Sequence, residues 1–223
     1  LRFSDGSRIT ARDYAFAILL SAAPQLAAIG GATNDSDAIV GVDAYKNGTA
    51  NAISGLRVYN DTQMAITIKA EYLPYFYELG LLSYVPYPIS VIAPGCEVAD
   101  DGSGAYIRNS DANVTEPVFT AELLEKTILD PETGYMSHPS VVSGPYKLVS
   151  FDGQTAQFEI NEYYKGNAAG VKPSIEKITY KTVSNDTMVQ QLESGEIDLL
   201  NKCVAADTVQ KGIQAVSSED FSM

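Results

Sequence analysis

Apolar residues recur along this chain at two different periods, and each period predicts a different kind of element. Between residues 14 and 22 the apolar positions follow helical spacing, and Pro24 comes directly after that run. Thr10 precedes the run and Asp13 follows Thr10 by three positions, which is the capping-box arrangement of a helix start. We therefore predict a helix that begins after Thr10 and ends before Pro24.

Alternation at period two predicts two hairpins. Residues 54–60 and 63–70 alternate on either side of a turn at Asn60-Asp61-Thr62, with β-branched and aromatic residues at the apolar positions. Residues 145–151 and 155–161 alternate in the same way around Asp152-Gly153-Gln154. Further elements are expected after the second hairpin: a strand over 175–183, a helix over about 186–194, a strand over 196–200 and a helical tail over 205–216.

The remaining stretches are less regular. Residues 30–39 are rich in Gly, Asn, Asp and Ser and are predicted to form a loop. A short helix is expected from residue 73, with Pro74 in its first turn, and a longer one over 117–129. Residues 94–116 are predicted to be a polar, acidic excursion without regular structure, and residues 130–140 a turn-rich connector at a domain boundary.

Composition narrows the class of protein. A chain of 223 residues with 45% hydrophobic residues can bury a core as one large or two small domains. No window approaches about 18 consecutive apolar residues, the length of a membrane span. The net charge of −13 would repel phosphate, which argues against binding to nucleic acid or to an anionic lipid surface.

Candidate catalytic groups are few. The only histidine, His138, lies in the connector, and no serine stands in a G-x-S-x-G arrangement, so a surface histidine is favoured over a catalytic triad. Cys96 and Cys203 have no metal-ligand spacing and are interpreted as unpaired thiols. A disulfide between them is the alternative interpretation. The acidic segments 34–37 and 100–104 do not fit a calcium loop. We predict neither an enzyme nor a bound metal or cofactor.

Several segments, in a fixed order, resemble family 5 of the extracellular solute-binding proteins, the oligopeptide- and dipeptide-binding components of ABC importers. The resemblance begins with "FSDGSRITARDYAFAILLSAAP", continues through "YKNG", "ISGLRVYNDTQMAITI" and "LPYFYELG", and resumes at "SGPYKLVSFDGQTAQFEINEYYKG". It closes on "IEKITYKTV" and "LESGEIDLL". These segments cover roughly two thirds of the chain. Residues 93–140 include an insertion that does not match the best-known members.

The resemblance implies a mixed α/β fold, namely part of lobe I of a class II periplasmic-binding-protein-like clamp. Residues 1–140 would be the accessory domain of lobe I, residues 141–203 part of its main sheet domain, and residues 204–223 a helical tail that leads towards lobe II. The start at Leu1, with no basic or apolar leader before it, favours a piece of a longer protein. The resemblance implies that this piece is a central fragment and that lobe II lies outside it.

Ligands of open α/β sheets bind at the carboxyl ends of the strands, which here follow the segments 175–183 and 196–200. We therefore expect Asn201 and Lys202, with Ser184 as a weaker member, to line the ligand cleft. Ordinary polar loop residues are an equally good interpretation of these positions. Asn201 offers a donor and an acceptor to a peptide backbone, and Lys202 can pair with a carboxylate.

The resulting hypothesis is an extracytoplasmic substrate-binding protein of an ABC importer that binds oligopeptides and delivers them to a membrane permease. It would act as a monomer and be tethered to the membrane as a lipoprotein. A secreted hydrolase that uses paired carboxylates and a surface adhesion domain remain alternatives. The sequence does not decide between a peptide, a sugar, a nickel complex and an opine as the ligand.

Overall fold

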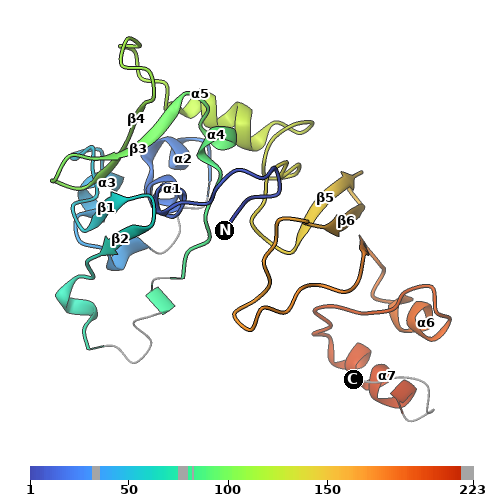
Figure 1. Ribbon diagram of the computed structural model, residues 1–223. Helices are drawn as coiled ribbons and strands as arrows, with labels where there is room; N and C mark the ends of the chain where they lie inside the picture. Colours follow the sequence, from blue (N-terminus) through green and yellow to red (C-terminus); the bar gives the residue numbers. More distant parts are fainter. Residues whose placement is uncertain (32–35, 75–79, 82, 217–223) are drawn as a thin grey trace. The chain divides into compact units, whose positions relative to one another are not determined.

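The computed structural model describes residues 1–31, 36–74, 80–81 and 83–216 (Figure 1). The chain divides into two compact units. The first unit consists of residues 1–151 and 157–178, and the second of residues 152–156 and 179–223.

Helix α1 (Ala11–Ala22) lies at the centre of the first unit. Its start is the predicted capping box: the backbone N–H of Thr10 donates to Asp13 Oδ2 at 2.7 Å, and Thr10 Oγ1 donates to the same oxygen at 2.9 Å. Burial raises the pKa of the Asp13 carboxyl, against the effect of the two hydrogen bonds from Thr10. Figure 1 shows α1 beside the strands β1 (Leu56–Asn60) and β3 (Cys96–Asp100), which it contacts. The predicted helix is confirmed.

The described part of the first unit also contains short helices. They are α2 (Pro24–Ala28), the 3-10 turns η1 (Ser36–Ala38) and η2 (Ala70–Tyr72), α3 (Val42–Lys46), α4 (Ile89–Ile92) and α5 (Ala121–Leu124), which continues as the π-helical turn η4 (Glu125–Leu129). The helix predicted over 117–129 is confirmed, with a start at Ala121 because Thr120 Oγ1 accepts from the N–H of Leu123. Most of the helix predicted from residue 73 lies outside the described residues, and so do residues 32–35 of the loop predicted over 30–39.

The first predicted hairpin is confirmed as the antiparallel pair of β1 (Leu56–Asn60) and β2 (Gln63–Ile66). Asn60 forms its turn, since the Asn60 side-chain oxygen accepts hydrogen bonds from the N–H and the hydroxyl of Thr62. The buried residues of β1, Leu56 and Val58, belong to the core of the unit.

Residues 96–109 contradict the predicted irregular excursion. They form a second antiparallel hairpin, β3 (Cys96–Asp100) and β4 (Ala105–Asn109), in continuous register from the pair Cys96–Asn109 to the pair Asp100–Ala105. Val98 and Ala105 are fully or almost fully buried. The prediction was wrong because the acidic residues of this segment, Glu97 and Asp100 among them, masked a strand whose alternate positions belong to the core.

The core of the first unit joins α1 to both hairpins and to the short helices. Its largest fully buried side chains come from segments that lie far apart in the sequence: Phe16, Ile18, Leu19, Ile39, Val42, Ile53, Leu56, Ile92, Val98 and Leu124. Burial of a large aliphatic or aromatic side chain contributes about 1.5–3 kcal/mol. The hairpin formed by β3 and β4 is therefore part of the core rather than an appendage.

The three strands β5 (Tyr146–Phe151), β6 (Thr155–Ile160) and β7 (Lys177–Lys181) form a sheet in which β6 is central. The turn between β5 and β6 is held by Asp152, whose Oδ1 accepts from the N–H groups of Gln154 and Thr155 at 2.9 and 2.7 Å. The predicted hairpin and the predicted strand after it are both confirmed.

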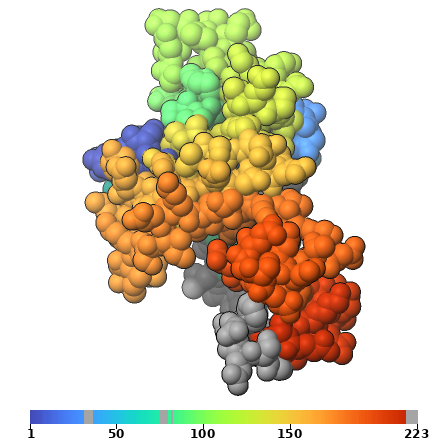
Figure 2. Space-filling model, turned by 90° about the vertical axis from the view of Figure 1, so that its right-hand side faces the viewer, coloured from blue at the N-terminus to red at the C-terminus, as the bar shows by residue number. Residues whose placement is uncertain are grey.

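The second unit is built on helices α6 (Met188–Glu193) and α7 (Ala206–Val216), as predicted. The two helices contact each other and appear in orange and red in Figure 2. Met188, Val189 and Ala215 form the small core of this unit.

The strand predicted over 196–200 is absent from the structure, and Leu199 in this segment is 80% exposed. That prediction was wrong because an extended segment becomes a strand only beside a partner, and none of the described residues pairs with this one. No helix of the described residues is long and apolar enough to cross a membrane.

Candidate functional site

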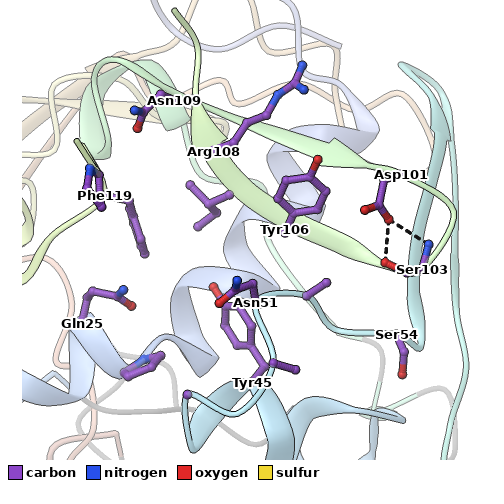
Figure 3. A pocket seen from close by; sticks show the side chains of 16 residues that line it. Gln25, Tyr45, Asn51, Ser54, Asp101, Ser103, Tyr106, Arg108, Asn109 and Phe119 are labelled. Carbon is purple, nitrogen blue, oxygen red and sulfur yellow. Dashed lines mark hydrogen bonds between the residues drawn. The ribbon is translucent and has the colours of Figure 1, made fainter. Parts of the chain in front are cut away.

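A cavity of about 940 Å³ opens in the first unit between α2, the segment that precedes β1, and the hairpin of β3 and β4 (Figure 3). This volume is within the range of small-molecule and cofactor sites. The cavity is lined by Pro24, Gln25, Tyr45, Gly48, Ala50, Asn51, Ala52, Ser54, Asp101, Ser103, Tyr106, Ile107, Arg108, Asn109, Pro117 and Phe119.

Aromatic side chains supply much of the apolar wall of the cavity. Tyr45 projects from α3 and is almost completely buried, and burial raises the pKa of its hydroxyl. Phe119 and Tyr106 contribute partly buried rings from two other segments (Figure 3). Rings of this kind offer flat, rigid contact area to an organic ligand.

Three neutral polar side chains of the cavity are available to a ligand. Within the described part of the chain, the side chains of Gln25, Asn51 and Ser54 make no hydrogen bond to another residue. In Figure 3 the amide groups of Gln25 and Asn51 face the same open space. Asn109 differs, because its side chain already binds the backbone of Val114, Glu116 and Val118.

The two charged side chains of the cavity already have partners. Arg108 Nη2 lies 2.6 Å from Glu97 Oε1 across the hairpin, and this carboxylate raises the pKa of the Arg108 guanidinium. Asp101 Oδ1 accepts from the N–H and the hydroxyl of Ser103, and these bonds hold the pKa of Asp101 below its usual value. The cavity thus offers aromatic surface and neutral hydrogen-bonding groups rather than a charged pocket.

Sequence reasoning missed this cavity because it depends on the hairpin of β3 and β4. One signal was available: Cys96 and Val98 are apolar on either side of Glu97, and Gly102-Ser103 is a turn sequence before Tyr106 and Ile107. A short alternation followed by a turn was therefore present within the acidic segment.

The predicted ligand-binding residues lie in the second unit. Ser184 follows β7, and its backbone carbonyl accepts from the N–H groups of Thr187 and Met188, so this serine begins the turn into α6. Asn201 and Lys202 lie in the segment between α6 and α7. All three residues are exposed.

The residues that precede Ser184 and Asn201 in the sequence pack against one hydrophobic core. Val183 and Leu200, which directly precede Ser184 and Asn201, both pack against the small core of Met188, Val189 and Ala215. The two loops that carry the predicted residues are therefore anchored on the same core. Lys202 has a φ of 59°, a left-handed conformation that is uncommon for a residue other than glycine.

The single histidine and the two cysteines were the other candidates for a chemical role. His138 Nε2 lies 3.1 Å from the carbonyl oxygen of Pro131 in the connector. Cys96 is buried and Cys203 partly buried; both are free thiols, and burial raises the pKa of Cys96. Among the described residues, no group of three or more His, Cys, Asp or Glu side chains is arranged to hold a metal ion.

The fold is similar to that of solved oligopeptide-binding proteins. Lactococcal OppA complexed with an endogenous peptide in the closed conformation aligns with 94% of this chain and 33% of its own, with a TM-score of 0.66 and 24% identity. A periplasmic oligopeptide-binding protein of Borrelia burgdorferi, OppAIV, aligns with 99% of this chain and 36% of its own, with a TM-score of 0.63 and 21% identity. The expected mixed α/β fold of periplasmic-binding-protein type is thereby confirmed.

The class of protein is given by a family model. Residues 1–218 match the family model described as "Bacterial extracellular solute-binding proteins, family 5 Middle", so the chain belongs to this family. The resemblance found in the sequence is confirmed.

Two curated relatives are both named oligopeptide-binding protein OppA, from Lactococcus lactis subsp. lactis and from Lactococcus lactis subsp. cremoris strain SK11. Each is 26% identical over 215 residues, which cover 94% of this chain and 30% of the relative. The chain thus spans about a third of the length of the curated relatives that it matches.

Proposed function

We propose that the protein to which this chain belongs is the substrate-binding protein of an ABC importer and that it binds oligopeptides for uptake. The observation that carries the proposal is the match of residues 1–218 to the solute-binding family 5. The names of the curated relatives, oligopeptide-binding protein OppA, support peptides as the class of ligand.

In this proposal the loops that follow β7 and α6 form the part of the ligand site that this chain contributes. Asn201 would exchange hydrogen bonds with the peptide backbone, and the ammonium group of Lys202 would pair with a carboxylate of the peptide. Ser184 would contribute a hydroxyl. Their exposure and the shared core beneath their loops support this assignment.

Ligand capture would proceed by closure of two lobes around the peptide, which excludes water and strengthens each polar contact. The protein would act outside the cytoplasm as a monomer, tethered to the membrane as a lipoprotein, and would hand the peptide to a membrane permease. It would not alter the peptide chemically.

The test is isothermal titration calorimetry of the full-length protein with peptides of three to eight residues and, separately, with oligosaccharides, followed by mass spectrometry of the recovered ligand. The proposal expects peptides to bind and to be recovered intact. Binding of sugars alone would contradict the ligand class. Recovery of cleaved peptides or sugars would favour the hydrolase, and no binding of any solute would favour the adhesion domain.

A further inference from the structure

The outer edge of β4 borders the cavity of the first unit and carries unpaired backbone groups. The N–H of Ser110 donates to the carbonyl of Gly95, so even-numbered residues of this strand face β3. The N–H of Ile53 donates to the carbonyl of Ala105 from the opposite side. Because backbone groups alternate along a strand, Ala105, Ile107 and Asn109 direct their N–H and C=O groups away from β3.

Among the residues that the structure describes, one end of this outer edge has a partner and the other has none. Ile53 forms a single antiparallel bridge with Ala105, and the chain before Ile53 does not continue the pairing. Within the described part of the chain, no residue outside the hairpin forms a backbone hydrogen bond with Ile107 or Asn109. Asn51 and Ala52, which a longer ladder would place opposite β4, instead line the cavity together with Ile107 and Asn109.

The two outer edges of the hairpin therefore differ in what lies beside them. The outer edge of β3 is covered: Arg12, on α1, donates from Nη1 to the carbonyl of Val98. The outer edge of β4 instead faces a cavity of about 940 Å³. An open strand edge beside a cavity is the arrangement that accepts an additional strand, with main-chain hydrogen bonds for affinity and side-chain pockets for alternate residues.

We propose that this cavity binds an extended peptide that continues the ladder begun by Ile53 and pairs with the backbone of Ile107 and Asn109. Alternate side chains of the peptide would contact the rings of Tyr45 and Phe119, and the free amides of Gln25 and Asn51 would bind its remaining polar groups. This inference goes beyond the proposed function, because it concerns the first unit and none of Ser184, Asn201 and Lys202.

The test is amide hydrogen exchange of the full-length protein, read residue by residue with mass spectrometry. The probe is a library of end-capped hexapeptides randomised over all residues except Cys and Pro, because strand pairing tolerates most sequences. We expect the library to slow exchange at Ile107 and Asn109 by about 10-fold or more. Tyr106 and Arg108, whose N–H groups face β3, should be protected with or without the library.

The matched control is the same library N-methylated at every residue, so that methyl groups face β4 whichever edge the peptide presents and strand pairing is blocked. It should leave exchange at Ile107 and Asn109 unchanged. Equal protection by both libraries would overturn the proposal, as would no protection by either. Slow exchange at Ile107 and Asn109 before any peptide is added would also overturn it, because another part of the protein would then cover the edge.

A pair of substitutions at Ile107 tests the same edge by hydrogen exchange. Of the backbone hydrogen-bonding groups, Ile107→Pro removes one outward-facing N–H, at a position where edge strands tolerate proline, whereas Ile107→Val keeps this N–H. Protection of Asn109 by the library should be lost in Ile107→Pro and retained in Ile107→Val. If Ile107→Pro unfolds the hairpin, exchange at Tyr106 and Arg108 will accelerate without peptide, and the N-methylated library then decides. Protection confined to residues 184 and 201–202 would support the proposed function and overturn this inference.

Discussion

The guanidinium of Arg57 and the carboxylate of Asp100 join β1 to β3 through a hydrogen bond of 2.8 Å from Nε to Oδ2. The same oxygen accepts from the N–H of Val58 at 2.8 Å, and Oδ1 accepts from the N–H of Gly102 at 2.8 Å. The side chain of Asp100 is only 4% exposed. This carboxylate therefore connects the two hairpins and also shapes the turn between β3 and β4.

Asp100→Ala should destabilise the protein by about 2 kcal/mol, because it leaves the N–H of Val58 and the guanidinium of Arg57 without their acceptor. The measurement is the urea midpoint of unfolding. Asp101→Ala is the matched control, because Asp101 carries the same charge, is the next residue in the chain and is exposed. The control should have a clearly smaller effect, and equal effects would contradict the role assigned to Asp100.

Asp100 should also make the stability of the protein depend on pH in the acid range. Burial opposes its ionisation, but the hydrogen bonds from Arg57, Gly102 and Val58 outweigh burial and hold its pKa below the usual value. A carboxyl with a lowered pKa stabilises the fold above its unfolded pKa of about 3.9, and this stabilisation is lost as the pH falls through the folded pKa.

The difference in unfolding free energy between the wild type and Asp100→Asn should therefore be constant above about pH 5 and shrink below about pH 4. Subtraction of the variant cancels the contributions of the other carboxyls. A difference that stays constant down to about pH 2 would contradict the lowered pKa.

Gly104 lies where the hairpin of β3 and β4 meets Ile53. Its φ is 149°, and a Cβ atom at this position would lie 2.5 Å from the carbonyl oxygen of Ile53. Gly104→Ala should therefore destabilise the protein by about 2 kcal/mol or more. Gly102→Ala is the control, because Gly102 also has a positive φ, of 102°, but has open space around its Cβ position. Thermal unfolding of the two variants separates the steric clash from backbone strain.

Lys202 should contribute to peptide affinity in the full-length protein. Lys202→Gln removes the charge that we expect to pair with a peptide carboxylate and should weaken binding of free peptides by about 10-fold, but not of peptides with an amidated C-terminus. Lys211→Gln, which removes an exposed lysine from α7, is the control and should bind as the wild type does. Calorimetry with both peptide forms makes the comparison. Equal losses for both forms would contradict the carboxylate contact.

Local sequence signals located most of the elements. The capping box of Thr10 and Asp13 located α1, and the turns at Asn60 and Asp152 located two hairpins, because each signal acts within a few residues. The predicted site residues were found to be exposed on two loops that share a core, and their role in ligand binding stays a prediction.

The two errors have opposite causes. Residues 94–116 appeared too polar for a strand, yet α1 and β1 supply the apolar contacts that bury Val98 and Ala105, and Arg57 neutralises Asp100. Residues 196–200 appeared well suited to a strand, yet the described residues offer them no partner. In both cases the deciding contacts come from residues far away in the sequence.

By itself the sequence determined the helix after Thr10, three strands of the sheet around β6, the family and the low content of catalytic groups, because periodicity, turns and ordered motifs are local properties. Only the tertiary structure decided that an acidic segment forms the hairpin of β3 and β4 and that one edge of it opens on a cavity. The physical reason is that a strand edge is satisfied or left open by whichever distant segment lies beside it, and here Ile53 pairs with one end alone.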